Sequence, residues 1–310
     1  MTFKQTWELF RDAATAWSDD YAPSMGAALA YYTMFSVAPL LLIVISVAGL
    51  VFGAEAARGE IFGQLRGLVG ETGALAIQGV LESISKPAEG VMATIIGLVV
   101  LLLGATTVFG ELQDALDRIW RAPARTRSSG VWTLLRSRLL SFGMIMGIGF
   151  LLMVSLVASA VLSALGKWWS PLFGGWTTVL HVVNFAFSFA LATTMFAMIY
   201  KIMPRVRIQW RDVWIGAGVT ALMFTIGKLL IGLYIGRSGV ASTFGAAGSL
   251  VVVMLWVYYS AQIFLLGAEF TWVYAHAFGS RRGQAEPERG DVPARTEEPD
   301  LPPPPAPKAA

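Results

Sequence analysis

The sequence predicts an all-α, polytopic integral membrane protein that crosses the bilayer six times. Composition is the first indication, because hydrophobic residues make up 55% of the chain and charged residues only 14%, whereas soluble domains carry about 25% charged residues. The second is a set of six segments that stay apolar over the roughly 20 residues that a spanning helix needs. They are residues 25–53, 91–110, 139–165, 177–203, 213–236 and 247–275, within a membrane domain of residues 25–277.

Residues 1–24 form a predicted N-terminal amphipathic segment. Its apolar residues recur at intervals of three or four, which is typical of a helix lying flat at the headgroup level; a soluble amphipathic helix is the alternative. They are Trp7, Phe10, Ala14, Trp17 and Tyr21. The segment contains acids as well as bases and the apolar run after it is too long for a signal peptide, so we expect it to be retained.

The first span, residues 25–53, contains Pro39, which frees a backbone carbonyl one turn earlier and favours a kink or a local polar patch. Tyr31 and Tyr32 precede it and are candidates for hydrogen bonds across the bundle. The alternative for both tyrosines is packing with the hydroxyl at an interface.

Two stretches outside the spans have helical patterns. Residues 55–86 predict short amphipathic helices in the first outer loop, broken near Gly70 and Gly73. Residues 111–123 are expected to extend the second spanning helix as far as Pro123. Their apolar face consists of Leu112, Ala115, Leu116, Ile119 and Trp120.

The distribution of basic residues predicts the orientation, since Lys and Arg are enriched in cytoplasmic loops. Residues 119–138 hold five arginines and no acid, whereas residues 54–90 hold five glutamates against three bases. Both termini are therefore expected on the cytoplasmic side. The loop after the fourth span contains Arg205, Arg207 and Arg211, which are candidates for binding lipid headgroups. Topology alone is the alternative explanation of their charge.

Polar residues inside the spans are the candidate transport path, because such residues usually face a bundle interior or a watery cavity. Tyr258, Gln262 and Glu269 share one face of the last helix. Lys228 and Asn184 lie in the fifth and fourth spans, with Tyr31 and Tyr32 as further candidates.

Each charged candidate has a simpler interpretation. Lys228 can snorkel to the outer headgroups, and Glu269 can be an interfacial carboxylate paired with the basic inner loops. Their depths argue against a direct bridge between them. In the same helix as Lys228, Gly232 and Gly236 form a GxxxG spacing that predicts close helix packing.

Several classes of function are disfavoured. The chain contains no cysteine, and His181 and His276 lie far apart, so neither a metal site nor another cofactor is expected. The spans leave no water-exposed hydrolytic constellation, so we expect no enzyme, and the charge pattern gives no reason to expect nucleic acid. Residues 278–310 predict a disordered, Pro-rich cytoplasmic tail; a solvated tail is favoured over a site for a protein partner.

Three stretches resemble the BrkB/YihY family of bacterial inner-membrane proteins, formerly labelled ribonuclease BN. They are AALAYYTMFSVAPLLL (27–42), YKIMPRVRIQWRDVWIGAGVTALMFTIGKLLIGLYI (200–235) and STFGAAGSLVVVMLWVYYSAQIFLLGAEFTWVYA (242–275). The resemblance implies a six-helix protein of the bacterial plasma membrane. Serum resistance, envelope lipid export and cation/proton exchange have been proposed for different members, and the ribonuclease label is regarded as a misassignment.

The leading functional hypothesis is a transporter-like protein that moves an amphipathic envelope lipid or lipid-linked molecule, with membrane lipids as its partners. A cation/proton antiporter that uses Glu269 is one alternative, and a non-transporting scaffold for envelope machinery is another. The sequence leaves open whether the protein forms a homo-oligomer.

Overall fold

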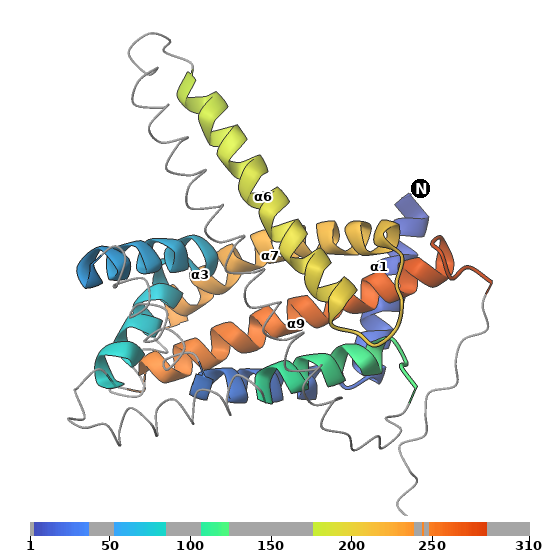
Figure 1. Ribbon diagram of the computed structural model, residues 1–310, viewed down its shortest axis with the longest axis horizontal. Coiled ribbons are helices and arrows are strands. Elements are labelled where there is room, and N and C mark those ends of the chain that lie inside the picture. The colour runs from blue at the N-terminus through green and yellow to red at the C-terminus, as the bar shows by residue number, and fades with distance from the viewer. Residues whose placement is uncertain are drawn as a thin grey trace, which may run out of the picture.

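The computed structural model describes residues 3–36, 53–84, 107–123, 176–238, 244 and 248–283, and every regular element within them is a helix. The helices are α1 (Phe3–Asp19), α3 (Ala54–Ile84), α6 (Trp176–Ile202), α7 (Trp210–Ser238) and α9 (Gly248–Ala277), and residues 22–36 and 107–119 are helical too. Figure 1 shows α7 and α9 running along one another, with α1 crossing one end of α9 and α3 lying at the other.

Three of these helices are long and apolar enough to cross a membrane: Val182–Ile202, Trp210–Ser238 and Gly248–Ala277. They confirm the helices predicted at residues 177–203, 213–236 and 247–275. Of the other predicted spans, 25–53 is described only up to residue 36, and 91–110 only from residue 107. The span at 139–165 and Pro39 lie outside the described residues, so the count of six remains a prediction.

Helix α1 packs against the C-terminal part of α9, and the Phe10 and Phe270 rings lie 4.9 Å apart. The face that α1 packs against the bundle overlaps the predicted apolar face in part. Leu9, Ala13 and Ala16 are buried and Phe10 and Trp17 are partly buried against the same cluster, whereas Trp7 and Tyr21 are exposed. That these exposed aromatic residues lie at the headgroup level stays a prediction.

The first outer loop also differs from the prediction. Instead of two short helices broken near Gly70 and Gly73, the structure has one helix, α3, which bends between its two halves (Figure 1). Its buried residues Ala74, Ala76 and Ile77 pack with aliphatic residues of α7 and α9. This tertiary packing offsets the low helix propensity of glycine, which is a weak local preference.

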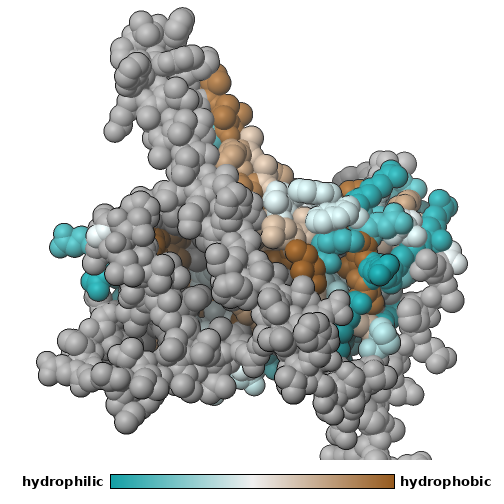
Figure 2. Space-filling model, viewed as in Figure 1, coloured by the Kyte–Doolittle hydropathy of each residue, from teal (hydrophilic) through white to brown (hydrophobic). Residues whose placement is uncertain are grey.

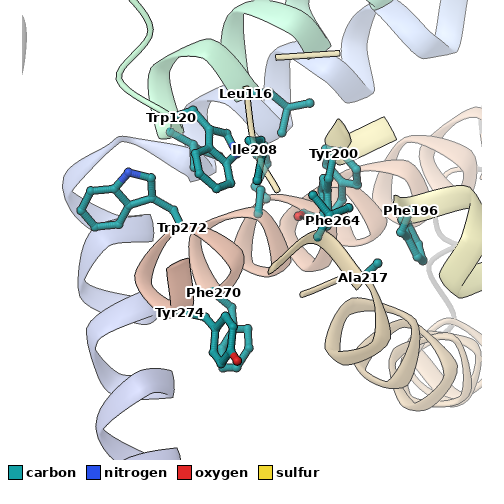
Figure 3. Close-up of a cluster of buried hydrophobic side chains, with 14 of the residues drawn as sticks. Leu116, Trp120, Phe196, Tyr200, Ile208, Ala217, Phe264, Phe270, Trp272 and Tyr274 are labelled. Atoms are coloured by element: carbon teal, nitrogen blue, oxygen red, sulfur yellow. Dashed lines mark hydrogen bonds between the residues drawn. The ribbon is translucent and has the colours of Figure 1, made fainter. Parts of the chain in front are cut away.

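Residues 107–119 are helical, as predicted from residue 111 onward, but the helix ends before Pro123; its continuation from the second span lies outside the described residues. Leu116, Ile119 and Trp120 are almost completely buried and join the main hydrophobic cluster (Figure 3). The helix ends in a Schellman turn in which the amide of Ala122 donates to the carbonyl of Asp117 at 2.8 Å. Arg121 occupies the left-handed position of this turn with φ of 48°.

The chain after α9 folds back instead of leaving the domain at residue 278, where the tail was predicted to begin. The carboxylate of Asp212, buried in the first turn of α7, accepts hydrogen bonds from the Ser280 amide at 3.1 Å and the Ser280 hydroxyl at 2.5 Å. Residues 278–283 are thus fastened to α7, and the rest of the predicted tail lies outside the described residues.

Candidate functional site

Helix α7 indicates where the bilayer lies. Trp210 and Trp214 are exposed at its start and Tyr234 is exposed near its end, as in the aromatic belts of membrane helices. From Trp214 to Tyr234 the helix rises about 30 Å, which equals the thickness of the hydrocarbon core. The residues exposed between these belts are apolar and include Leu222, Ile226, Leu229, Leu230 and Leu233.

A reciprocal contact fixes the register of α7 on α9. A Cβ atom added to Gly216 would lie 1.8 Å from Thr271 Oγ1, and one added to Gly267 would lie 2.0 Å from Thr220 Oγ1. Each helix thus presents a glycine to the threonine of the other. Each threonine hydroxyl donates within its own helix, Thr220 to the Gly216 carbonyl at 2.8 Å and Thr271 to the Gly267 carbonyl at 2.7 Å.

This register places Glu269 and Lys228 at different depths. Glu269 is only 1% exposed and lies between Gly267 and Thr271, hence at the level of Gly218 on α7. From there to Lys228 α7 advances ten residues (218 to 228), or about 15 Å. The two charged residues therefore lie at different depths and do not form a direct pair.

Gln262 lies at the contact between α9 and the helix of residues 22–36. Its Nε2 is 3.5 Å from the Pro23 carbonyl, and a Cβ atom on Gly26 would lie 2.0 Å from the same nitrogen. Its buried Oε1 has no hydrogen-bond partner among the described residues. Half-buried Tyr258 and buried Glu269 occupy the same face of α9, so a polar stripe runs along this contact.

The structure does not bring every predicted path residue to that stripe. Asn184 is exposed, together with its neighbours Val183 and Phe185, on the part of α6 that projects from the bundle (Figure 1). Tyr31 is half exposed and its ring packs edge-on against Tyr32 at 5.5 Å. The tyrosine pair thus belongs to the helix beside the stripe, whereas Asn184 lies away from it.

The predicted headgroup arginines differ in what they contact. Arg205 is tied to helix 107–119, because its Nε lies 3.1 Å from Asp117 Oδ2 and its backbone amide donates to Asp117 Oδ1 at 2.8 Å. Arg207 and Arg211 are exposed at the start of α7. Arg205 is also partly exposed, but its side chain is held by Asp117, whereas no side-chain partner is described for Arg207 or Arg211.

Sequence reasoning missed residues whose partners are distant along the chain. The buried Tyr200 hydroxyl donates to the Phe264 carbonyl at 2.7 Å and lies 3.1 Å from Thr220 Oγ1, joining α6, α7 and α9. Asp212 and Ser280 form the second such connection. Nothing local marks these residues, since a partner more than 20 positions away leaves no periodic pattern.

The face of the molecule in Figure 2 differs in hydropathy from one region to another. Figure 2 shows hydrophilic residues gathered over the end that carries α1 and the C-terminal end of α9, and hydrophobic residues along α6. Together with the aromatic residues at the start of α7, this distribution indicates that the hydrophilic end lies at a membrane surface.

Comparison with known proteins gives a consistent result. The family model described as virulence factor BrkB matches residues 13–291. A UPF0761 membrane protein of Pseudomonas paraeruginosa is 29% identical over 267 residues, which cover 84% of this chain and 61% of the relative. One of Tolumonas auensis is 28% identical over 260 residues, with 81% and 80% covered. This chain thus spans about three fifths of the length of the first relative, and no solved structure matches it.

Proposed function

Because this chain belongs to the virulence factor BrkB family, whose curated relatives are named membrane proteins, we propose that it moves an amphipathic envelope lipid or lipid-linked molecule across the bacterial inner membrane. The observation that carries the proposal is the polar stripe of α9. It places a fully buried carboxylate, Glu269, and an amide oxygen without a described partner, that of Gln262, inside a spanning helix. Polar groups buried inside a spanning helix are costly, and they mark functional sites such as transport paths.

The distribution of cations favours a lipid as the cargo. Arg207 and Arg211 are exposed at the level of the inner headgroups, and Lys228 lies on α7 about 9 Å inside the level of Tyr234. A phosphate-bearing headgroup would meet positive charge near both surfaces, while its acyl chains follow the exposed apolar side of α7.

The test is transbilayer movement of a fluorescent phospholipid in proteoliposomes, with and without a proton gradient. We expect movement above protein-free vesicles that is lost in Glu269→Gln and reduced in Lys228→Ala. Asn184→Ala is the matched control inside a span and should move lipid at the normal rate, because Asn184 lies away from the stripe. Unchanged movement in Glu269→Gln would contradict the proposed path.

A cation/proton antiporter is the second candidate, favoured by the burial of Glu269 within a span. The same proteoliposomes, loaded with a pH-sensitive dye, separate the two candidates. Cation-dependent proton movement that disappears in Glu269→Gln, without any lipid movement, would establish exchange. Proton movement that is absent under every cation gradient would exclude it.

A non-transporting scaffold is the third candidate, and the turn at Ser280 determines where a deletion that tests it should begin. A deletion of residues 284–310 removes the predicted tail while keeping the turn that Asp212 and Ser280 hold. Loss of the cellular phenotype with intact lipid movement would favour a scaffold that acts through the tail. Loss of lipid movement in the same deletion would count against it.

We also propose that both termini face the cytoplasm, because the end that carries α1 and residues 278–283 is rich in arginine. The chain has no cysteine, so single cysteines can report the orientation without a background. Gly283→Cys should react with an impermeant maleimide in inverted membrane vesicles and stay unlabelled in intact spheroplasts. The reverse pattern would invert the topology.

A further inference from the structure

Two tryptophans and two arginines form a reciprocal cluster where the end of α9 meets residues 107–123. The guanidinium carbon of Arg121 lies 4.2 Å from the centroid of the Trp272 ring, and that of Arg281 lies 5.3 Å from the Trp120 ring. Each segment thus supplies one indole and the arginine that covers the indole of the other segment. Figure 3 shows Trp120 and Trp272 at this junction, where they are part of the buried hydrophobic cluster.

The indole N–H groups of both tryptophans are buried. Trp120 is 1% exposed and Trp272 is 8% exposed, and neither Nε1 has a hydrogen-bond partner among the described residues. A polar group that is withdrawn from water without gaining a partner destabilises the folded state, so buried donors normally have an acceptor. Any acceptor for these two donors therefore lies outside the described residues.

The depth of the cluster indicates the type of ligand. Thr271 lies opposite Gly216, so Trp272 lies at the level of Ile215, next to the exposed Trp214. This is the level of the lipid headgroups in the register derived above. Two guanidinium groups at that level favour an acceptor with negative charge, and phosphate oxygens suit both guanidinium and indole donors.

We propose that Trp120, Trp272, Arg121 and Arg281 bind the phosphate of an anionic phospholipid from the cytoplasmic leaflet. This site differs from the α9 stripe and from Arg207 and Arg211, and it holds a lipid whether or not the protein moves one. Arg121 occupies the left-handed position of the Schellman turn, and its guanidinium group lies over the Trp272 ring.

A purely structural clamp is the competing interpretation, and the chemistry separates the two. A clamp needs the aromatic rings and the cations, whereas a phosphate site also needs the indole N–H groups. Trp→Phe keeps a six-membered aromatic ring beneath the guanidinium group but removes the indole N–H donor. Trp256→Phe is the matched control. The Nε1 of Trp256 is also buried without a described partner, but this residue lies further along α9, away from the cluster, and packs against Phe224 of α7.

The experiment is lipid titration of the full-length protein, purified in detergent with its lipids removed and followed by native mass spectrometry. We expect phosphatidylglycerol to bind about tenfold more tightly than phosphatidylcholine. Trp120→Phe and Trp272→Phe should each weaken phosphatidylglycerol binding about tenfold, the usual effect of losing one hydrogen bond to a charged acceptor. Trp256→Phe should bind as the unaltered protein does.

Three results would overturn the site: unchanged phosphatidylglycerol binding in both variants, an equal loss in Trp256→Phe, or equal affinity for phosphatidylcholine. Soluble glycerol phosphate that binds as tightly as phosphatidylglycerol would show an anion site that does not select lipid.

If a variant does not fold, indole ¹H–¹⁵N spectra of the unaltered protein provide the test. Two indole resonances should shift with phosphatidylglycerol, and none with phosphatidylcholine; an unchanged spectrum would overturn the site. This experiment measures lipid binding and not lipid movement, so a negative transport assay would not affect its result.

Discussion

The two ends of the α7–α9 pair are built differently. At the end that carries α1, glycine and threonine interlock between the helices, Tyr200 connects three helices, and residues 107–123 cover the remaining side. At the other end, the described residues of α3 join a smaller cluster with α7 and α9, and most large residues of α7 are exposed there. Among the described residues, side-chain packing is thus concentrated near one membrane surface, while apolar residues along the rest of α7 stay exposed.

The largest expected difference between the two ends comes from leucine truncation. Leu265→Ala should lower the free energy of unfolding by about 2–5 kcal/mol, because this completely buried side chain leaves a cavity. Leu229→Ala, at a position 63% exposed on α7, should change it by less than about 0.5 kcal/mol. Unfolding by SDS in mixed micelles measures both. Equal losses would show that the end of α7 near α3 is packed as tightly as the end near α1.

Glycine substitutions should give effects of opposite sign. Gly267→Ala should destabilise by about 1–3 kcal/mol, because its Cβ would collide with Thr220 and with the Tyr200 hydroxyl. Gly232→Ala is the control, with open space around its Cβ, and should stabilise by up to about 1 kcal/mol through helix propensity. The same SDS titration applies. If both substitutions stabilise the protein, the close contact at Gly267 does not exist.

The open space at Gly232 and Gly236 also corrects one sequence prediction. Their GxxxG spacing predicted close packing, but the close contacts occur at Gly216 and Gly267, each of which is followed four residues later by threonine. A spacing of small residues marks where a helix can be approached. Which of two such sites is used depends on the partner, and that information lies in another part of the chain.

Removal of the buried Asp212 carboxylate should have the next largest effect. Asp212→Ala leaves the Ser280 amide without its acceptor and should cost about 1–3 kcal/mol. Asp12→Ala removes an exposed carboxylate paired with its neighbour Arg11 and should be nearly neutral. Proteolysis near residue 280 provides a second measurement, since a released turn should be cleaved faster. Unchanged stability and cleavage would show that the turn holds without Asp212.

The smallest effect is expected at the ion pair between Arg205 and Asp117. Arg205→Ala should cost about 1 kcal/mol or less, because the arginine is partly exposed although Asp117 is mostly buried. The loss should shrink in high salt as the charges are screened. Thermal unfolding at two ionic strengths measures this. A loss independent of salt would assign the contribution to packing of the arginine side chain instead of its charge.

The sequence was sufficient for elements that carry their own pattern. Helices α6, α7 and α9 begin and end within three residues of the predicted bounds, since long apolar runs define them. The residues 111–123 showed their buried face through periodicity. Among the candidate site residues, Tyr258, Gln262 and Glu269 were placed on one face because helical spacing determines faces.

What the sequence did not predict depends on contacts between distant segments. The exposure of Asn184 follows from the direction that α6 takes away from the bundle, which no local pattern encodes (Figure 1). The two arginines over Trp120 and Trp272 come from segments about 150 residues apart, and the fold alone brings them together. In the same way, the exposure of Trp7 was decided by the surface that α9 offers to α1.

The contact between Gln262 and Pro23 joins residues 239 positions apart. At a synthesis rate of about 5–20 residues per second, the first helix leaves the ribosome roughly 10–50 seconds before its partner on α9 exists. During that interval the residues of α1 and of helix 22–36 that pack on α9 lack this partner. A chain that stops before α9 therefore leaves that contact surface of its earliest segments uncovered.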